Sequence, residues 1–227
     1  MRQANTRILR LLLPILTGLP MVVGSVAYAD DVASEASTTE AYTNQVLLTD
    51  FTKPDLNARW FVRNDNVMGG RSLGQMSIDA GIMTMTGRIN TNGGGFTSVM
   101  MDVTKSSNQN ETTLPTFKGA RGLQLQIRAS DTPVHRPWRL RVRDDEPRRR
   151  GINFRGLLNA DESIPPDQWQ TVIVWFADLI PTLSGRELNP ENWAPLNVER
   201  IRRLGIMLND TGDGLYQFEV RRVELVW

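Results

Sequence analysis

The sequence predicts an all-β protein built as a single β-sandwich. Apolar and polar residues alternate along short segments, as in LQLQIRA at 123–129 and WRLRVRD at 138–144, and this period is typical of strands with one buried face. Gly, Pro, Asn and Asp separate these segments, and few of them show a helical period. Many short strands with few helices indicate two packed sheets.

Each expected strand shows this alternation or a short apolar run between turn residues. Besides 123–129 and 138–144, strands are expected at 46–51, 59–63, 75–78, 82–89, 96–103, 152–157, 171–176, 203–208 and 215–227. Residues 106–119 are expected to form a surface loop, and 189–199 an irregular or weakly helical segment. NDTGDG at 209–214 is expected to be a hairpin turn, because it lacks the later Glu of a calcium-binding loop.

The first 29 residues have the features of an export signal. Arg2, Arg7 and Arg10 precede an apolar run that ends in Ala-Tyr-Ala at 27–29, a typical cleavage pattern. The run is short for a membrane span and contains two prolines, so we expect a cleaved signal peptide. Attachment to a membrane through an uncleaved segment is the alternative. The mature protein is expected to be exported, either periplasmic or secreted.

Residues 30–45 are acidic, rich in Ser and Thr, and nearly free of large apolar side chains. Such a composition favours a flexible, solvated linker, because it offers little apolar surface to bury. A single folded domain is therefore expected at 46–227.

The composition excludes several classes of site. After residue 29 the chain keeps 23 of its 26 basic residues and all 25 acidic residues, because the first segment holds three arginines and no acid. Export and a nearly neutral charge disfavour nucleic acid as a partner. The chain has no cysteine, which excludes disulfides, thiol catalysis, zinc–thiolate sites and a lipoprotein anchor.

The segment NDNVMGGRS, residues 64–72, combines turn-forming residues with two glycines. Gly69 and Gly70 allow positive φ, and Val67 and Met68 are expected to pack beneath the turn as an apolar plug. One interpretation is a structural corner of the sandwich. The other is a loop that presents four polar side chains to a ligand, namely Asn64, Asp65, Arg71 and Ser72.

A second glycine-rich segment, NTNGGGFTSV at 90–99, could lie beside the first. Neither segment has the Gly-Lys-Ser/Thr of a P-loop or the strand–helix setting of a dinucleotide fingerprint. A strand is instead expected after the glycines, which would let the backbone approach a ligand closely. The binding residues predicted in this segment are Gly94, Gly95, Phe96 and Ser98.

Four segments in order, RWFVRNDNVMGGRS, GRINTNGGGFTSV, WQTVIVWFADLIPTLSGREL and IRRLGIMLNDTGDGLYQFEVRRVEL, resemble the complex I intermediate-associated protein 30 family. The resemblance runs from about residue 46 to residue 225. It implies a galactose-binding-like jelly roll. Mitochondrial members of that family assist the assembly of respiratory complex I, so the resemblance implies an assembly-factor or chaperone role.

Residues typical of catalysis are few. His135 is the only histidine and lies in a proline-flanked segment without a thiol partner, which disfavours a histidine-based triad. The acidic residues at 144–146 and 161–162 are of the type that cleaves glycosides. Adjacent acids on a strand point to alternate faces, however, so a solvated turn is expected. No catalytic residue, metal or cofactor is predicted.

Arginine is concentrated at 136–155, where eight arginines occur and no lysine. Arg139, Arg141 and Arg143 alternate with apolar residues and so share one face of a strand. Arg128 lies on the polar face of the preceding strand, and the two rows form one surface if the strands are neighbours. This surface is either a solvated face or a binding site for an anion, because guanidinium groups bind carboxylate and phosphate in a bidentate way.

The sequence thus predicts an exported, non-enzymatic protein with a binding or assembly role. A carbohydrate-binding module for an acidic glycan is the first alternative, and an enzyme of unknown type is the second. The expected partner is a protein in an assembly or an anionic glycan. The ligand and the oligomeric state are left open.

Overall fold

The computed structural model describes residues 44–104, 112–129, 136–147, 151–158, 167–209 and 212–227. These residues belong to one compact unit, Ala41–Trp227. The predicted export signal and almost all of the predicted linker lie outside the described residues, as do His135 and the acidic residues at 161–162. No helix in the described segments has the length and apolarity that a membrane crossing requires.

One of the two sheets has six strands. Their order is β3 (Leu73–Asp79), β4 (Ile82–Ile89), β13 (Gly214–Val226), β6 (Gly122–Ala129) and β9 (Gln170–Trp175), with β1 (Gln45–Thr49) paired to β13. Every described pair in this sheet is antiparallel. The long strand β13 therefore pairs with three strands, β1, β4 and β6.

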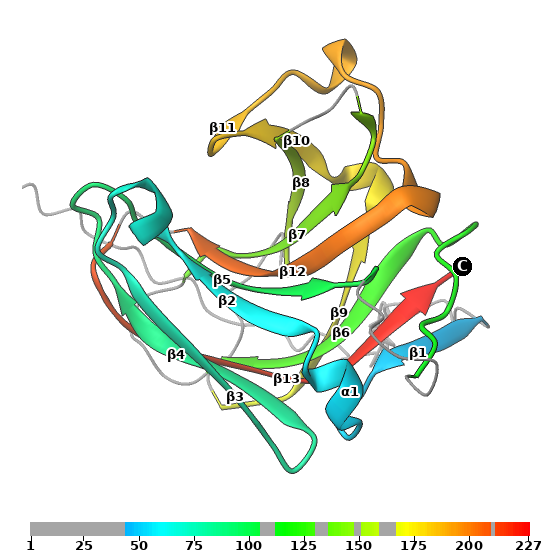
Figure 1. Cartoon of the computed structure of the whole chain (residues 1–227), viewed down its shortest axis with the longest axis horizontal. Coiled ribbons are helices and arrows are strands. Elements are labelled where there is room, and N and C mark those ends of the chain that lie inside the picture. The colour runs from blue at the N-terminus through cyan, green and yellow to red at the C-terminus, as the bar shows by residue number, and fades with distance from the viewer. Residues whose placement is uncertain (1–43, 105–111, 130–135, 148–150, 159–166, 210–211) are drawn as a thin grey trace, which may run out of the picture. The chain divides into compact units, whose positions relative to one another are not determined.

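The second sheet has seven strands. Their order is β11 (Arg186–Glu187), β10 (Ile180–Leu183), β8 (Ile152–Leu157), β7 (Trp138–Asp144), β12 (Ile201–Asn209), β5 (Phe96–Asp102) and β2 (Trp60–Asn64). All of these pairs are antiparallel as well. Figure 1 shows the two sheets as layers, with β10 and β11 bending away from the six-stranded sheet. The predicted all-β sandwich is confirmed.

Short helical segments connect some of the strands. They are α1 (Pro54–Asn57) and the single turns η1 (Asp65–Met68), η3 (Phe176–Asp178), η4 (Pro190–Asn192) and η5 (Val198–Arg200). The last two lie in the segment predicted to be irregular or weakly helical.

Aromatic side chains join the two sheets at the centre of the core. Trp138 on β7 packs on Phe218 of β13 with ring centroids 4.2 Å apart, and it meets Tyr216 edge-on at 5.6 Å. The hydroxyl groups of Tyr216 and Thr97, on β5, are 2.7 Å apart and form a buried hydrogen bond between the sheets. These contacts fix the seven-stranded sheet by its inner face, which leaves its outer face to solvent.

The predicted strands agree with the observed ones, apart from two. All eleven expected strands are present within a few residues of their predicted ends, whereas β10 and β11 were not expected. Pro181 interrupts the pattern of β10, and β11 has only two residues. Both lie at an edge of the sheet, where short strands and proline are tolerated.

Two expectations about strand neighbours are wrong. The strands β12 and β13, which flank 209–214, belong to different sheets, so they do not form the hairpin that was expected there. The strands β6 and β7 also belong to different sheets, so Arg128 does not share a surface with Arg139, Arg141 and Arg143. Alternation along a strand shows which side chains share a face, but it does not show which strand is the neighbour.

Candidate functional site

Asp65 joins the two glycine-rich segments. Its side chain, at the first residue of η1, is fully buried. Oδ1 accepts the backbone N–H of Ser72 at 2.9 Å, while Oδ2 accepts those of Gly95 at 2.7 Å and Phe96 at 3.3 Å. One carboxylate thereby fixes the turn after β2 against the start of β5.

These hydrogen bonds favour the charged form of the carboxyl group. Burial raises the pKa of Asp65, but the hydrogen bonds from Ser72, Gly95 and Phe96 outweigh it and hold the pKa below its ordinary value of 3.8. Asp65 is therefore ionised at neutral pH, and its charge is committed to backbone N–H groups.

The carboxylate of Asp65 also explains why residues 70 and 94 are glycines. A Cβ atom at Gly70 would lie 2.2 Å from Cγ of Asp65, and one at Gly94 would lie 2.2 Å from its Oδ2. Glycine is required at residue 69 by the backbone conformation and not by lack of space. Its φ of +88° lies in the left-handed region, whereas a Cβ there would meet nothing within 4 Å. Positive φ was predicted at both Gly69 and Gly70, and it occurs only at Gly69.

The predicted apolar plug beneath this turn is wrong. Val67 and Met68 are 58% and 62% exposed, because the space beneath the turn is filled by the carboxylate of Asp65. The turn is held by hydrogen bonds to a buried charge, and its apolar side chains face outward.

The outer face of the seven-stranded sheet carries a set of arginines. On β7 the inward side chains Leu140 and Val142 are buried, so the alternate residues project outward. The register places Arg141 opposite Arg155 of β8. The arginines on this face are Arg63, Arg139, Arg141, Arg143, Arg155 and Arg203.

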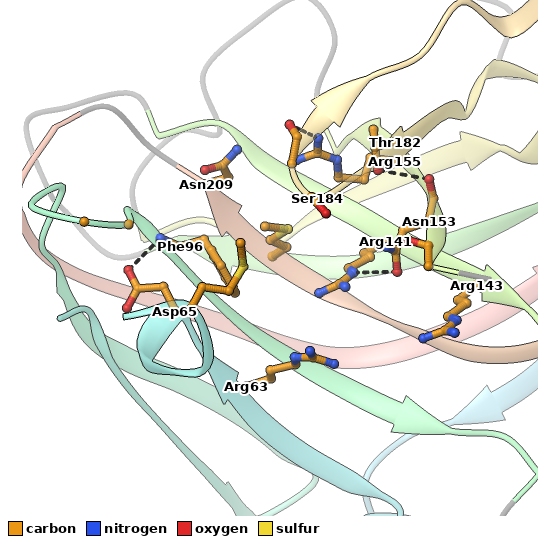
Figure 2. A pocket seen from close by; sticks show the side chains of 16 residues that line it. Arg63, Asp65, Phe96, Arg141, Arg143, Asn153, Arg155, Thr182, Ser184 and Asn209 are labelled. Atoms are coloured by element: carbon orange, nitrogen blue, oxygen red, sulfur yellow. Dashed lines mark hydrogen bonds between the residues drawn. The ribbon is translucent and has the colours of Figure 1, made fainter. Parts of the chain in front are cut away.

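A pocket of about 340 Å³ lies over this face, and we call it the arginine pocket. Figure 2 shows Arg63, Arg141 and Arg143 projecting into the same space from β2 and β7. The turn after β2 lies at one end of the pocket and the β10–β11 turn at the other. The lining residues are Arg63, Asp65, Met68, Gly93, Gly94, Phe96, Arg141, Arg143, Gly151, Asn153, Arg155, Thr182, Ser184, Gly185, Met207 and Asn209.

The charges around the arginine pocket do not balance. Four of its lining residues are arginines, and Asp65 is the one carboxylate among the described residues that line it. That carboxylate accepts three backbone N–H groups, so it does not pair with the arginines. Among the described residues, the lining therefore carries more positive than negative charge, which favours an anionic ligand.

Arg141 shows this imbalance most clearly. Its Nε donates to Oδ1 of Asn153 at 3.1 Å, a neutral partner. Burial, together with the positive charges of Arg63 and Arg155, lowers the pKa of Arg141 to about 10. In addition, the Nε–H groups of Arg139 and Arg155 are buried without a hydrogen-bond partner among the described residues.

Hydrogen bonds hold the far wall of the pocket. Nη2 of Arg155 donates to the carbonyl oxygen of Gly185 at 2.8 Å, and Oγ1 of Thr182 donates to the carbonyl oxygen of Asn153 at 3.0 Å. Figure 2 shows both bonds beside the hydroxyl of Ser184. The β10–β11 turn is thereby fixed next to the arginines, and the hydroxyl of Ser184 in this turn lines the pocket.

The structure brings some of the predicted binding residues together and separates others. Five of them line the arginine pocket, namely Asp65, Gly94, Phe96, Arg141 and Arg143. Ser72 and Ser98 are buried and bond to the backbone of Asn90 and Arg63 respectively. Asn64 donates to the carbonyl oxygen of Gly74, Gly95 donates to Asp65, and Arg71 is exposed outside the pocket lining.

Two of the predicted arginines belong elsewhere. Arg139 lines a separate cavity of about 370 Å³ together with Trp175. Arg128, on the six-stranded sheet, forms an ion pair with Glu219 and lies over the ring of Trp169 at 4.7 Å. Both contacts of Arg128 are within the protein, so it has a structural role.

Sequence reasoning missed several lining residues. Arg63 and Arg155 stand alone among apolar neighbours in their strands, and only the alternation in WFVRN and INFRGL could have placed them on the outer face. Apart from three glycines, the remaining missed residues have no distinct sequence signal and are Asn153, Thr182, Ser184, Met207 and Asn209.

Among the described residues, no group of three or more His, Cys, Asp or Glu side chains could hold a metal ion. The acidic residues at 144–146 instead meet polar and basic groups. Asp145 accepts from Nε of Arg200 at 2.7 Å, and Glu146 accepts from Nδ2 of Asn197 at 2.8 Å.

The fold and the site together define a jelly-roll domain with a cationic pocket on the outer face of one sheet. The chain belongs to the complex I intermediate-associated protein 30 family, whose model matches residues 49–220. No curated protein sequence gives a significant match.

Solved structures with a similar fold include a family 11 carbohydrate-binding module. The family 11 module of the cellulase Lic26A-Cel5E of Clostridium thermocellum is 14% identical with a TM-score of 0.54, over 81% of this chain and 94% of that chain. The Clostridium thermocellum module in complex with a β-1,3-1,4-mixed-linked tetrasaccharide gives the same identity and TM-score, over 80% of this chain and 95% of that chain. At this identity the likeness shows the fold.

Proposed function

We propose that this protein is a non-catalytic binding module whose arginine pocket takes an anionic ligand, and that the ligand is an acidic glycan. The observation that carries the proposal is a set of four arginines around one pocket, in whose described lining the one carboxylate is committed to the backbone. Guanidinium groups suit carboxylate and sulfate oxygens because they offer paired N–H donors in one plane. The volume of about 340 Å³ suits a small unit of a glycan chain.

Two further observations support a glycan. The hydroxyl of Ser184 lines the pocket and suits a sugar hydroxyl group, whereas the side chains of Asn153 and Thr182 already bond within the protein. The carbohydrate-binding module with the same fold was solved with a tetrasaccharide, so this sandwich is compatible with glycan binding.

The experiment is a glycan array probed with residues 30–227 at low and moderate salt. We expect binding to acidic glycans that weakens as salt rises, because ionic contacts are screened. The variant Arg141→Gln should bind much less, whereas the control Arg221→Gln, an arginine on the six-stranded sheet, should bind as the unmodified protein does. Binding that neither weakens as salt rises nor weakens in the Arg141→Gln variant would refute the proposal.

An acidic segment of a protein partner is the second candidate. Membership of a family described by its association with complex I intermediates favours it. The test is affinity capture from the native membrane or envelope fraction, with the unmodified protein and Arg141→Gln side by side. A single partner that is captured by the first and lost with the second would support this candidate over the glycan.

We also propose that the protein is exported and that its mature chain begins at Asp30. The basic start, apolar run and Ala-Tyr-Ala end of residues 1–29 support this. N-terminal sequencing of the native protein should return Asp30, and a sequence that begins at Met1 would contradict it.

A further inference from the structure

The arginine pocket has an apolar end as well as a charged one. Three apolar side chains line it, Met68 from η1, Phe96 from β5 and Met207 from β12. The register pairs Phe96 with Asn209, and Met207 lies one outward position further along β12. The apolar residues therefore gather at the end next to the turn after β2.

The buried carboxylate of Asp65 fixes the geometry of this apolar end. Asp65 begins η1, the same turn that carries Met68, and its Oδ2 accepts the backbone N–H of Phe96. Figure 2 shows Phe96 next to Asp65 and on the opposite side of the pocket from Arg155. The backbones that carry Met68 and Phe96 are thus held together before any ligand arrives, which limits the backbone entropy lost on binding.

Met68 does not contribute to the core. Its side chain is 62% exposed although it lines the pocket, whereas Met207, which also lines the pocket, is 6% exposed. An exposed methionine on an anchored turn offers a flexible, polarisable surface to a ligand. The opposite end of the pocket holds Arg141 and Arg143.

We infer that the pocket recognises an acid with an apolar face, namely a uronic acid unit, whose ring lies against Met68 and Phe96 while its carboxylate meets Arg141. A sugar ring presents C–H groups on one face, which suits an aromatic or thioether surface. A compact anion such as sulfate or phosphate can satisfy the arginines but makes no use of the apolar end. This inference rests on the proposed function and names the ligand class for the same site.

The inference assigns separate tasks to the two ends. Arg141 provides attraction for any anion, while Met68 and Phe96 select those anions that carry an apolar face. Neutral sugars lack the charge and should bind weakly or not at all. Selectivity therefore depends on both ends together.

The experiment measures binding of three probes by calorimetry, namely methyl glucuronide, methyl glucoside and inorganic sulfate. We expect the glucuronide to bind at least tenfold more tightly than either of the others. Met68→Ala should weaken the glucuronide at least threefold and leave sulfate unchanged. Val67→Ala is the matched control, because Val67 is also exposed in η1 but does not line the pocket.

The outcomes separate the two levels of the proposal. If Arg141→Gln weakens the glucuronide but Met68→Ala and Phe96→Leu do not, the inference fails and the proposed function stands. Sulfate that binds as tightly as the glucuronide also overturns the inference. If the unmodified protein binds no acidic sugar or acidic glycan at all, the inference and the proposed function both fail.

Discussion

The backbone N–H of Gly95 donates to Oδ2 of Asp65 at 2.7 Å, across 30 positions of the sequence. This contact ties the start of β5 to the turn after β2. Because both segments contribute to the arginine pocket, the stability of this contact and the shape of the site are linked.

Asp65→Asn is expected to destabilise the fold. The amide replaces one acceptor oxygen by an N–H donor that faces backbone N–H groups, and a buried group without its partner costs about 1–3 kcal/mol. Urea unfolding at pH 7 measures the loss. The control is Asp79→Asn, because Asp79 is exposed at the end of β3 and its replacement should change little. Equal stability of the two variants would contradict the structural role of Asp65.

The contribution of Asp65 is expected to depend on pH. Its pKa in the folded protein lies below the ordinary value of 3.8, so its stabilising effect is complete above about pH 4. The effect is lost as pH falls through the lowered pKa. The difference in unfolding free energy between the unmodified protein and Asp65→Asn should therefore shrink as pH falls from 4 toward 2. A constant difference over that range would show that the charge of Asp65 has no role.

Gly69→Ala and Gly70→Ala form a matched pair. Alanine at Gly69 meets no atom within 4 Å, so its cost is the left-handed backbone, about 1–2 kcal/mol. Alanine at Gly70 would meet the carboxylate of Asp65 at 2.2 Å and displace it. We expect Gly70→Ala to lower the melting temperature more. Its cost should also shrink in an Asp65→Ala background, whereas the cost of Gly69→Ala should not; additive costs at Gly70 and Asp65 would exclude the steric explanation.

Arg141→Gln is expected to leave stability unchanged or to raise it. Burial and neighbouring arginines lower the pKa of Arg141 to about 10, which means that the folded protein disfavours its positive charge. Removal of the charge relieves this repulsion, so a loss of binding would not come from unfolding. Thermal unfolding at pH 7 measures the effect. A melting temperature reduced as far as that of Gly70→Ala would show that Arg141 has a mainly structural role.

The strands could be predicted from the sequence because alternation is a local property. Leu140 and Val142 face the core and Arg141 faces outward, as their spacing indicates. The pairing of strands is not local. The strands β6 and β7 follow each other in the chain but belong to different sheets, so Arg128 was grouped with the wrong partners.

The candidate site could be predicted only in part for the same reason. Asp65 was named as a candidate residue from its turn-forming segment, but two of the N–H groups that it accepts lie about thirty residues away, and no local pattern indicates them. The apolar pair Val67 and Met68 was expected inside because apolar residues are usually buried. The buried carboxylate of Asp65 occupies the space beneath the turn instead.

The central proposal is that the arginine pocket is the binding site. Its most direct test is NMR of the isotopically labelled protein, with the side-chain N–H signals of the arginines assigned, during titration with an acidic oligosaccharide. We expect the signals of Arg63, Arg141 and Arg143 to shift together with one dissociation constant, while that of Arg221 on the six-stranded sheet stays in place. Shifts confined to Arg221 and Arg128, with the pocket arginines unchanged at saturation, would contradict the proposal.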